Sequence, residues 1–119
     1  MAKILLAEDD ESMRTFLANA LIRAGHQVDA VGDGLSAEGA VRREDYDVLV
    51  ADIVMPGIDG IELARRASSA QPQIRVMFIT GFAAVALKAR EEAPRDARVL
   101  SKPFHLREIV AEIDRMMAA

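Results

Sequence analysis

The sequence predicts an α/β protein in which a five-stranded parallel sheet is covered by helices on both faces. Five short apolar runs recur along the 119 residues, and each is followed by a segment with helical periodicity. The runs do not alternate with polar residues, which is typical of strands buried on both faces of a parallel sheet. Alternating strands and short helices need crossover connections, which are almost always right-handed, so a doubly wound sheet is expected.

The strands are expected at residues 4–7, 28–31, 48–51, 76–79 and 99–100. Apolar residues at steps of three and four predict the first helix: Met13, Phe16, Leu17, Ala20 and Leu21. Asp10 or Ser12 is its candidate N-cap and Gly25 its stop. Further helices are expected over 35–43, from Ile61 to just before Gln71, over 82–93 and over 105–117. The last is the clearest, since one face carries Leu106, Ile109, Val110 and Ile113.

The composition limits the function classes that fit the chain. No cysteine is present, which excludes disulfides, thiolate metal sites and thiol catalysis. The net charge of -4 argues against nucleic acid as a direct partner, because binding to phosphates needs a basic surface. The first apolar run is too short for a signal peptide or a membrane span. We therefore expect a cytoplasmic protein with no membrane insertion, and a single domain over residues 1–119 with no output domain.

Polar residues follow four of the five predicted strands. In open parallel sheets the site lies beyond the carboxyl ends of the strands, where the strand order reverses. The residues at these ends are Glu8, Asp9 and Asp10 after the first strand, Asp52 after the third, Thr80 after the fourth and Lys102 after the fifth. The second strand ends at residues 32–34, Gly-Asp-Gly, which is typical of a plain turn.

The carboxylates in this set predict a metal site. Carboxylates brought together repel one another unless a cation joins them, and Mg²⁺ suits a site with few protein ligands and several waters. The competing interpretation is that residues 8–10 form a solvated helix start, where negative charge is favoured anyway. That interpretation would be preferred for these three residues taken singly. It weakens once Asp52 ends an adjacent strand, since carboxylates are seldom buried without a partner.

Asp52 has the chemistry of a nucleophile toward phosphorus. Carboxylates form aspartyl-phosphates, and Mg²⁺ neutralises charge on the transferred group. Lys102 supplies a cation for a phosphoryl oxygen and Thr80 a hydroxyl donor. Taken singly, Lys102 is more often a surface lysine and Thr80 an ordinary strand residue. Their joint occurrence on successive strand ends favours the functional interpretation.

Other sites lack necessary residues. A nucleotide or flavin site needs a glycine-rich loop after the first strand, where this chain has acidic residues that repel phosphate. A phosphatase with an aspartyl intermediate usually carries a second acid two residues after the nucleophile, where Val54 stands. His26 is interpreted as a turn residue and His105 as a helix-start residue, neither with a catalytic role.

Four motifs together resemble the receiver domain of two-component response regulators over essentially the whole chain. They are Lys3-Ile-Leu-Leu-Ala-Glu-Asp-Asp10, Asp52-Ile-Val-Met-Pro-Gly-Ile-Asp-Gly60, Phe78-Ile-Thr-Gly81 and Ser101-Lys-Pro-Phe104. The resemblance implies a flavodoxin-like fold and phosphorylation by a histidine kinase or histidine phosphotransferase. It also implies a signalling domain, not an enzyme, that catalyses only its own phosphorylation and dephosphorylation.

The resemblance assigns roles to residues of this sequence. It makes Glu8 and Asp9 the acids that bind Mg²⁺, Asp52 the phospho-acceptor and a metal ligand, and the Val54 carbonyl a further ligand. Thr80 becomes the switch hydroxyl and Lys102 the phosphoryl-binding amine.

Two departures from the family pattern have consequences. Val99 stands three residues before Lys102, where receivers often have an aromatic ring that reports phosphorylation. Val54 and Phe82, two residues past Asp52 and Thr80, are both apolar and offer no group to orient an attacking water. We therefore expect slow self-dephosphorylation.

Residues 52–68, 77–87 and 99–110 are similar to stand-alone receivers of bacterial cell-cycle control. Such receivers act, when unphosphorylated, as adaptors that bring substrates to the ClpXP protease through its unfoldase ClpX. The apolar segment 82–87 fits a partner surface, or it simply packs onto the sheet. The final Ala118-Ala119 resembles tails that this protease recognises, or it is only a good helix end. A phosphate shuttle and a diffusible regulator of another machine remain alternatives.

Overall fold

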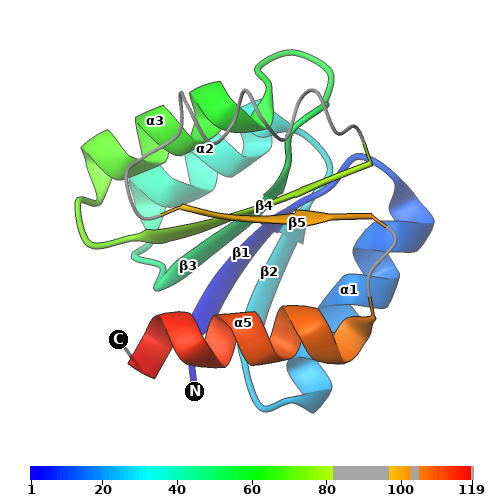
Figure 1. Ribbon diagram of the computed structural model, residues 1–119. Helices are drawn as coiled ribbons and strands as arrows, with labels where there is room; N and C mark the ends of the chain where they lie inside the picture. Colours follow the sequence, from blue (N-terminus) through cyan, green and yellow to red (C-terminus); the bar gives the residue numbers. More distant parts are fainter. Residues whose placement is uncertain (82–96, 103–104, 119) are drawn as a thin grey trace.

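A computed structural model describes residues 1–81, 97–102 and 105–118. Five parallel strands form one sheet in the order β2-β1-β3-β4-β5 (Figure 1). The strands are β1 Lys3–Ala7, β2 Gln27–Val31, β3 Val48–Asp52, β4 Arg75–Thr80 and β5 Arg98–Ser101. The chain moves outward from β1 to β2 and then returns past β1 to β3, so the strand order reverses between β1 and β3. The expected parallel, doubly wound sheet is confirmed.

Helices cover both faces of this sheet. They are α1 Glu11–Arg23, α2 Gly34–Arg43, α3 Gly60–Ala70 and α5 Leu106–Ala118. Figure 1 shows α1 and α5 on one face and α2 and α3 on the other. The helix expected over 82–93 lies outside the described residues. In the part of the chain that the structure describes, no helix is long and apolar enough to span a bilayer.

The core consists of two layers, one on each face of the sheet. Successive strand residues point to opposite faces, so Leu5 and Ala7 pack toward α2 and α3, while Ile4 and Leu6 pack toward α1 and α5. All four are fully buried. Burying one large apolar side chain contributes about 1.5–3 kcal/mol. The strands are therefore fixed from both sides, and so are the residues that follow their ends.

Aspartate side chains cap three helices at the carboxyl edge of the sheet. Asp10 accepts a hydrogen bond from the Met13 N–H at 2.8 Å, which identifies Asp10 and not Ser12 as the N-cap of α1. Asp33 and Asp59 cap α2 and α3 in the same way, at 2.7 and 2.9 Å. These caps satisfy N–H groups that would otherwise lack a partner. The segment 32–34 is thus more than a plain turn, because it starts α2.

The burial of strand β2 differs from the expectation. Its apolar run predicted burial on both faces, yet Asp29 and Ala30 are exposed and Val28 is only half-buried. The reason is topological: β2 is an edge strand, so it lacks a neighbour on one side. Local apolar character does not distinguish an edge strand from a central one.

Two further residues differ from expectation. Phe16 was placed on the core-facing side of α1, but it is 56% exposed, while Leu17 and Leu21 take the buried positions. His26 does follow the turn after α1, but its ring is buried and its Nδ1 accepts the Ala2 N–H at 3.0 Å. This bond joins the start of β1 to the start of β2. It lies at the amino ends of the strands, away from the candidate site at their carboxyl ends.

The start of α3 lies directly against the end of β3. A Cβ added to Gly60 would lie 2.4 Å from the Asp52 carbonyl oxygen and 2.8 Å from the Ile53 Cα. The Gly60 N–H also donates to the Ile53 carbonyl at 2.8 Å. Glycine at this position therefore allows α3 to pack against the backbone that carries Asp52.

We expect Gly60→Ala to lower the free energy of unfolding by about 1–3 kcal/mol, because backbone atoms must move to admit the methyl group. The matched control is Gly39→Ala in α2, where the added Cβ meets only the flexible end of Arg43, at 3.2 Å. That variant should gain roughly 0.5–1 kcal/mol from helix propensity. Urea unfolding followed by circular dichroism measures both, and equal stabilities would contradict the close approach at Gly60.

Candidate functional site

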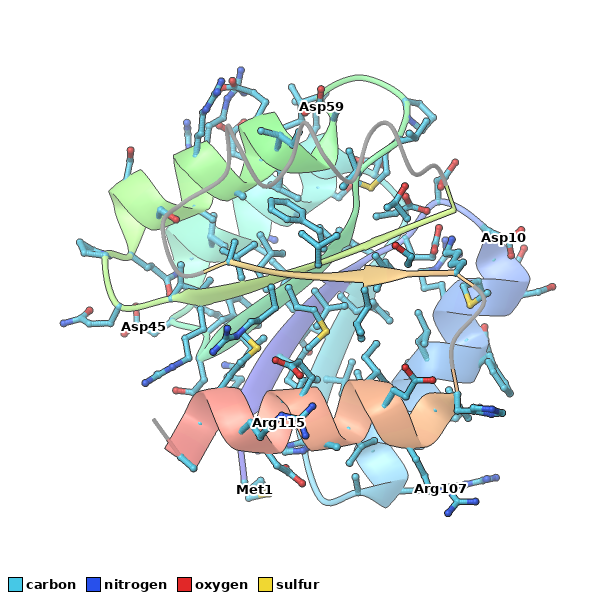
Figure 2. All side chains as sticks on the ribbon, viewed as in Figure 1. Met1, Asp10, Asp45, Asp59, Arg107 and Arg115 are labelled. Carbon is cyan, nitrogen blue, oxygen red and sulfur yellow. The ribbon has the colours of Figure 1, made fainter. Side chains whose placement is uncertain are left out.

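The carboxyl ends of β1, β3 and β5 bring an acidic cluster and a lysine together. Ligand oxygens of Glu8, Asp9 and Asp52 all lie within 4.8 Å of one another. The Lys102 Nζ lies 3.1 Å from Asp52 Oδ2 and 3.3 Å from Glu8 Oε1. Figure 2 labels Asp10, which follows this cluster at the start of α1. It also labels Asp45, which precedes β3 and lies at the opposite end of the strands, where they begin. The site residues expected on these three strands therefore do meet in space.

The structure holds Glu8 at several points. Its side chain is fully buried, and its Oε2 accepts the Asp10 N–H at 3.2 Å. Its own N–H donates to the Val31 carbonyl at 3.1 Å, which ties the end of β1 to the end of β2. Its carbonyl accepts a bond from Arg14 Nη1 at 2.9 Å. Glu8 therefore has little freedom to reorient.

Asp52 and Asp9 differ in their exposure. Asp52 is 8% exposed, and its Oδ1 accepts the Val54 N–H at 3.2 Å while Oδ2 faces Lys102. Asp9 is exposed to solvent. One side of the cluster is thus buried and fixed, and the other is open to an incoming group. Val54 stands at this strand end, and the role of its carbonyl as a ligand stays a prediction.

Burial and charge perturb the titration of the cluster. Burial raises the pKa of Glu8 to about 7, helped by the Asp52 charge and opposed by the Asp10 N–H and by Lys102. For Lys102, burial alone would lower the pKa, but hydrogen bonds and attraction to Asp52 and Glu8 outweigh it and raise the pKa. Lys102 is therefore a protonated counter-ion at neutral pH, shared between two buried carboxylates.

Thr80 and Val99 lie on the neighbouring strands β4 and β5. Thr80 is fully buried at the end of β4, and its carbonyl accepts the Lys102 N–H at 2.7 Å. The structure thus places Thr80 beside Lys102, while the role of its hydroxyl stays a prediction. Val99 is half-buried opposite Phe78 and packs against the cluster beneath α2 and α3. The position where receivers often carry an aromatic ring therefore holds a small, half-buried side chain packed against the core.

The donor set fits a hard divalent cation. All three acidic residues offer carboxylate oxygens, and the exposed Asp9 leaves the cluster open to water. Mg²⁺ prefers this arrangement because it keeps several waters and binds few protein oxygens. The acids contributed by Glu8, Asp9 and Asp52 are thus chemically suited to hold it.

The comparison with protein-family models identifies the class. The response regulator receiver domain matches residues 4–114, so the chain belongs to this family of signalling regulators. It is 56% identical to the response regulator receiver protein CpdR of Brucella abortus (strain 2308), over 100% of this chain and 99% of that protein. It is 38% identical to the transcriptional regulatory protein TcrA of Mycobacterium tuberculosis, over 93% of this chain but 44% of that protein.

Solved structures show the same fold. A response regulator receiver protein from Sinorhizobium medicae WSM419 matches with a TM-score of 0.92 at 28% identity, covering 98% of this chain and 94% of that one. The receiver domain of the sensor histidine kinase PA1611 from Pseudomonas aeruginosa PAO1 matches with a TM-score of 0.87 at 26% identity, covering 99% and 98%. That structure has a magnesium ion coordinated in its active-site cleft.

One residue beside the site was not indicated by the sequence pattern. Arg14 lies on α1 and reaches back to the carbonyl of Glu8. An arginine on an amphipathic helix is ordinary, and nothing in the local sequence shows that its side chain turns toward a strand end. The helical spacing does place it one turn past Asp10, which is the only signal that could have drawn attention to it.

We expect the metal-free protein to lose stability as the pH rises from about 4.5 to about 7, through a contribution that Glu8→Gln abolishes. The folded state raises the pKa of Glu8, so this group favours folding while protonated and disfavours it once ionised. At about 1.4 kcal/mol per pKa unit, the difference between wild type and variant is on the order of 3 kcal/mol. Urea unfolding at several pH values with a chelator measures it. The same pH dependence in both proteins would contradict the raised pKa.

Proposed function

We propose that this chain is a phosphorylation-dependent receiver, a single domain over residues 1–119, in which Asp52 accepts a phosphoryl group from a phosphohistidine donor. The donor is a histidine kinase or a histidine phosphotransferase. The observation that carries the proposal is the contact of Asp52 Oδ2 with Lys102 Nζ, at 3.1 Å, inside the same cluster as Glu8 and Asp9. Membership of the receiver family supports it.

Glu8, Asp9, Asp52 and the Val54 carbonyl would hold Mg²⁺, which when bound neutralises charge between the donor and Asp52. Asp52 attacks phosphorus through one carboxylate oxygen. The new O–P bond forms as the P–N bond to the donor imidazole breaks, and the imidazole leaves. Lys102 then pairs with a phosphoryl oxygen, and the Thr80 hydroxyl donates to another. Catalysis is limited to this transfer and to later hydrolysis.

The partner is proposed from the relative that matches along its whole length. The identity of 56% to CpdR covers nearly all of both proteins, and the resemblance noted in the sequence is to receivers that serve the ClpXP protease. We infer that the unphosphorylated chain binds ClpX as an adaptor in the cytoplasm, and that phosphorylation of Asp52 ends this binding. The apolar segment 82–87, which would face the partner, lies outside the described residues.

We expect phosphorylated Asp52 to hydrolyse slowly, and not within seconds. The Val54 side chain beside it is 48% exposed and has no polar atom to orient a water. Val54→Asn should speed hydrolysis several-fold, whereas Leu35→Asn, at an apolar residue that is 61% exposed on α2, should not change it. Intact-protein mass spectrometry after removal of the phosphoryl donor gives the rates. Decay of the wild type within seconds would contradict this role of Val54.

The adaptor role is tested by capture of purified ClpX on the immobilised chain, with and without Mg²⁺ and beryllofluoride, which mimics the phosphoryl group. Beryllofluoride should weaken capture by roughly 5- to 150-fold, the usual range for coupling between two sites. Asp52→Ala should capture ClpX in both conditions. Absence of capture in both states would refute the adaptor role, and loss of capture in Asp52→Ala would show that the unphosphorylated form is not the active one.

A further inference from the structure

We propose that Arg14 is a positioning residue for the metal-binding acids, and that the lack of a side chain at Gly32 leaves room for its guanidinium group. The inference rests on the proposed function, since it concerns how Glu8 and Asp9 are held for Mg²⁺. Arg14 lies on α1, and its side chain donates a hydrogen bond to the backbone carbonyl of Glu8.

The contact from Arg14 is a charged hydrogen bond to a main-chain acceptor. Its Nη1 donates to the Glu8 carbonyl at 2.9 Å, and the bond is partly buried. The backbone of Arg14 is itself fixed, because its N–H donates to the Asp10 carbonyl at 2.8 Å in the first turn of α1. Hydrogen bonds from a guanidinium are stronger than neutral ones. Arg14 therefore joins a rigid helix to the end of β1.

The carbonyl that Arg14 holds belongs to the peptide that leads into Asp9. The Glu8 carbonyl and the Asp9 N–H lie in one planar unit, so fixing the oxygen fixes the direction in which Asp9 leaves the strand. The Glu8 side chain has bonds of its own from Asp10 and Lys102. The Asp9 carboxylate is exposed and accepts no hydrogen bond from another described residue. Its placement near Glu8 and Asp52 thus depends on the backbone.

Gly32 provides an independent observation. A Cβ added to Gly32 would lie 3.1 Å from Arg14 Nη1 and 3.7 Å from Arg14 Cζ. Only Gly25 and Gly57 among the described glycines have positive φ, so the backbone at Gly32 does not itself require glycine. The distance resembles the one between Gly39 and Arg43, but here the same Nη1 donates to the Glu8 carbonyl, so the guanidinium can move aside only by straining that hydrogen bond. A side chain at position 32 would therefore disturb the contact that Arg14 makes.

The charge of Arg14 and its positioning role predict opposite effects on Mg²⁺ affinity when Arg14 is replaced. If the positive charge near the acids dominated, removing it would reduce repulsion and tighten Mg²⁺ binding. If positioning dominates, removing it frees the Glu8–Asp9 peptide and weakens binding. We assign the larger effect to position, because groups that orient metal ligands commonly change metal affinity by about 10- to 100-fold.

The test is the dissociation constant of Mg²⁺ for Arg14→Met, measured by isothermal titration calorimetry with circular dichroism to show that the protein is folded. We expect binding about tenfold weaker than in wild type. The control Arg23→Met removes the same charge from the exposed far end of α1 and should leave the affinity unchanged. An unchanged or tighter constant in folded Arg14→Met would overturn the inference.

Gly32→Ala provides a second test, first as a single variant and then in combination with Arg14→Met. Displacing the guanidinium by a few tenths of an ångström should weaken Mg²⁺ binding alone, by less than Arg14→Met does. In the Arg14→Met background the same change should have no further effect, since its target is gone. Additive effects of the two substitutions would overturn the inference. Failure of the wild type to bind Mg²⁺ would instead refute the proposed function on which it rests.

Discussion

The ammonium group of Lys102 lies between the carboxylates of Glu8 and Asp52, and the site depends on this contact. It joins residues 94 and 50 positions apart in the chain, at the carboxyl ends of three different strands. Two buried carboxylates side by side are unfavourable without a cation. Lys102 supplies that cation in the metal-free protein, and the raised pKa of Glu8 shows that it compensates for burial only in part. A divalent cation would complete the compensation, and it would also offset the negative charge of a phosphoryl group brought to the same cluster.

The fold supplies the rigidity that this cluster needs. Strand residues pack into two separate core layers, so each strand end is fixed from both faces of the sheet. Aspartate caps fix the helix starts at the same edge, and Gly60 lets α3 contact the backbone of Asp52. Arg14 and Gly32 extend this support to the loop that carries Asp9. The side of the site that carries Asp9 is exposed to solvent.

The sequence predicted the sheet, the strand ends and the meeting of Glu8, Asp52 and Lys102, because apolar runs and the geometry of parallel sheets carry that information locally. It did not predict the exposure of β2, since edge position depends on strand order. It also missed Arg14 and the buried ring of His26. The partners of both side chains come from other elements of the folded structure, and the spacing of apolar residues along the sequence does not predict such contacts. The pairing of Arg14 with Gly32 is of this kind, since the two residues are 18 positions apart in the sequence.

The most direct test of the account is the site and metal dependence of phosphorylation. Wild type and Asp52→Asn are incubated with a small phosphoryl donor such as phosphoramidate, with Mg²⁺ or with a chelator, and the intact mass is measured. We expect the gain of one phosphoryl group in the wild type with Mg²⁺, and none in Asp52→Asn or without the metal. Equal phosphorylation of Asp52→Asn, or phosphorylation that persists without metal, would contradict it.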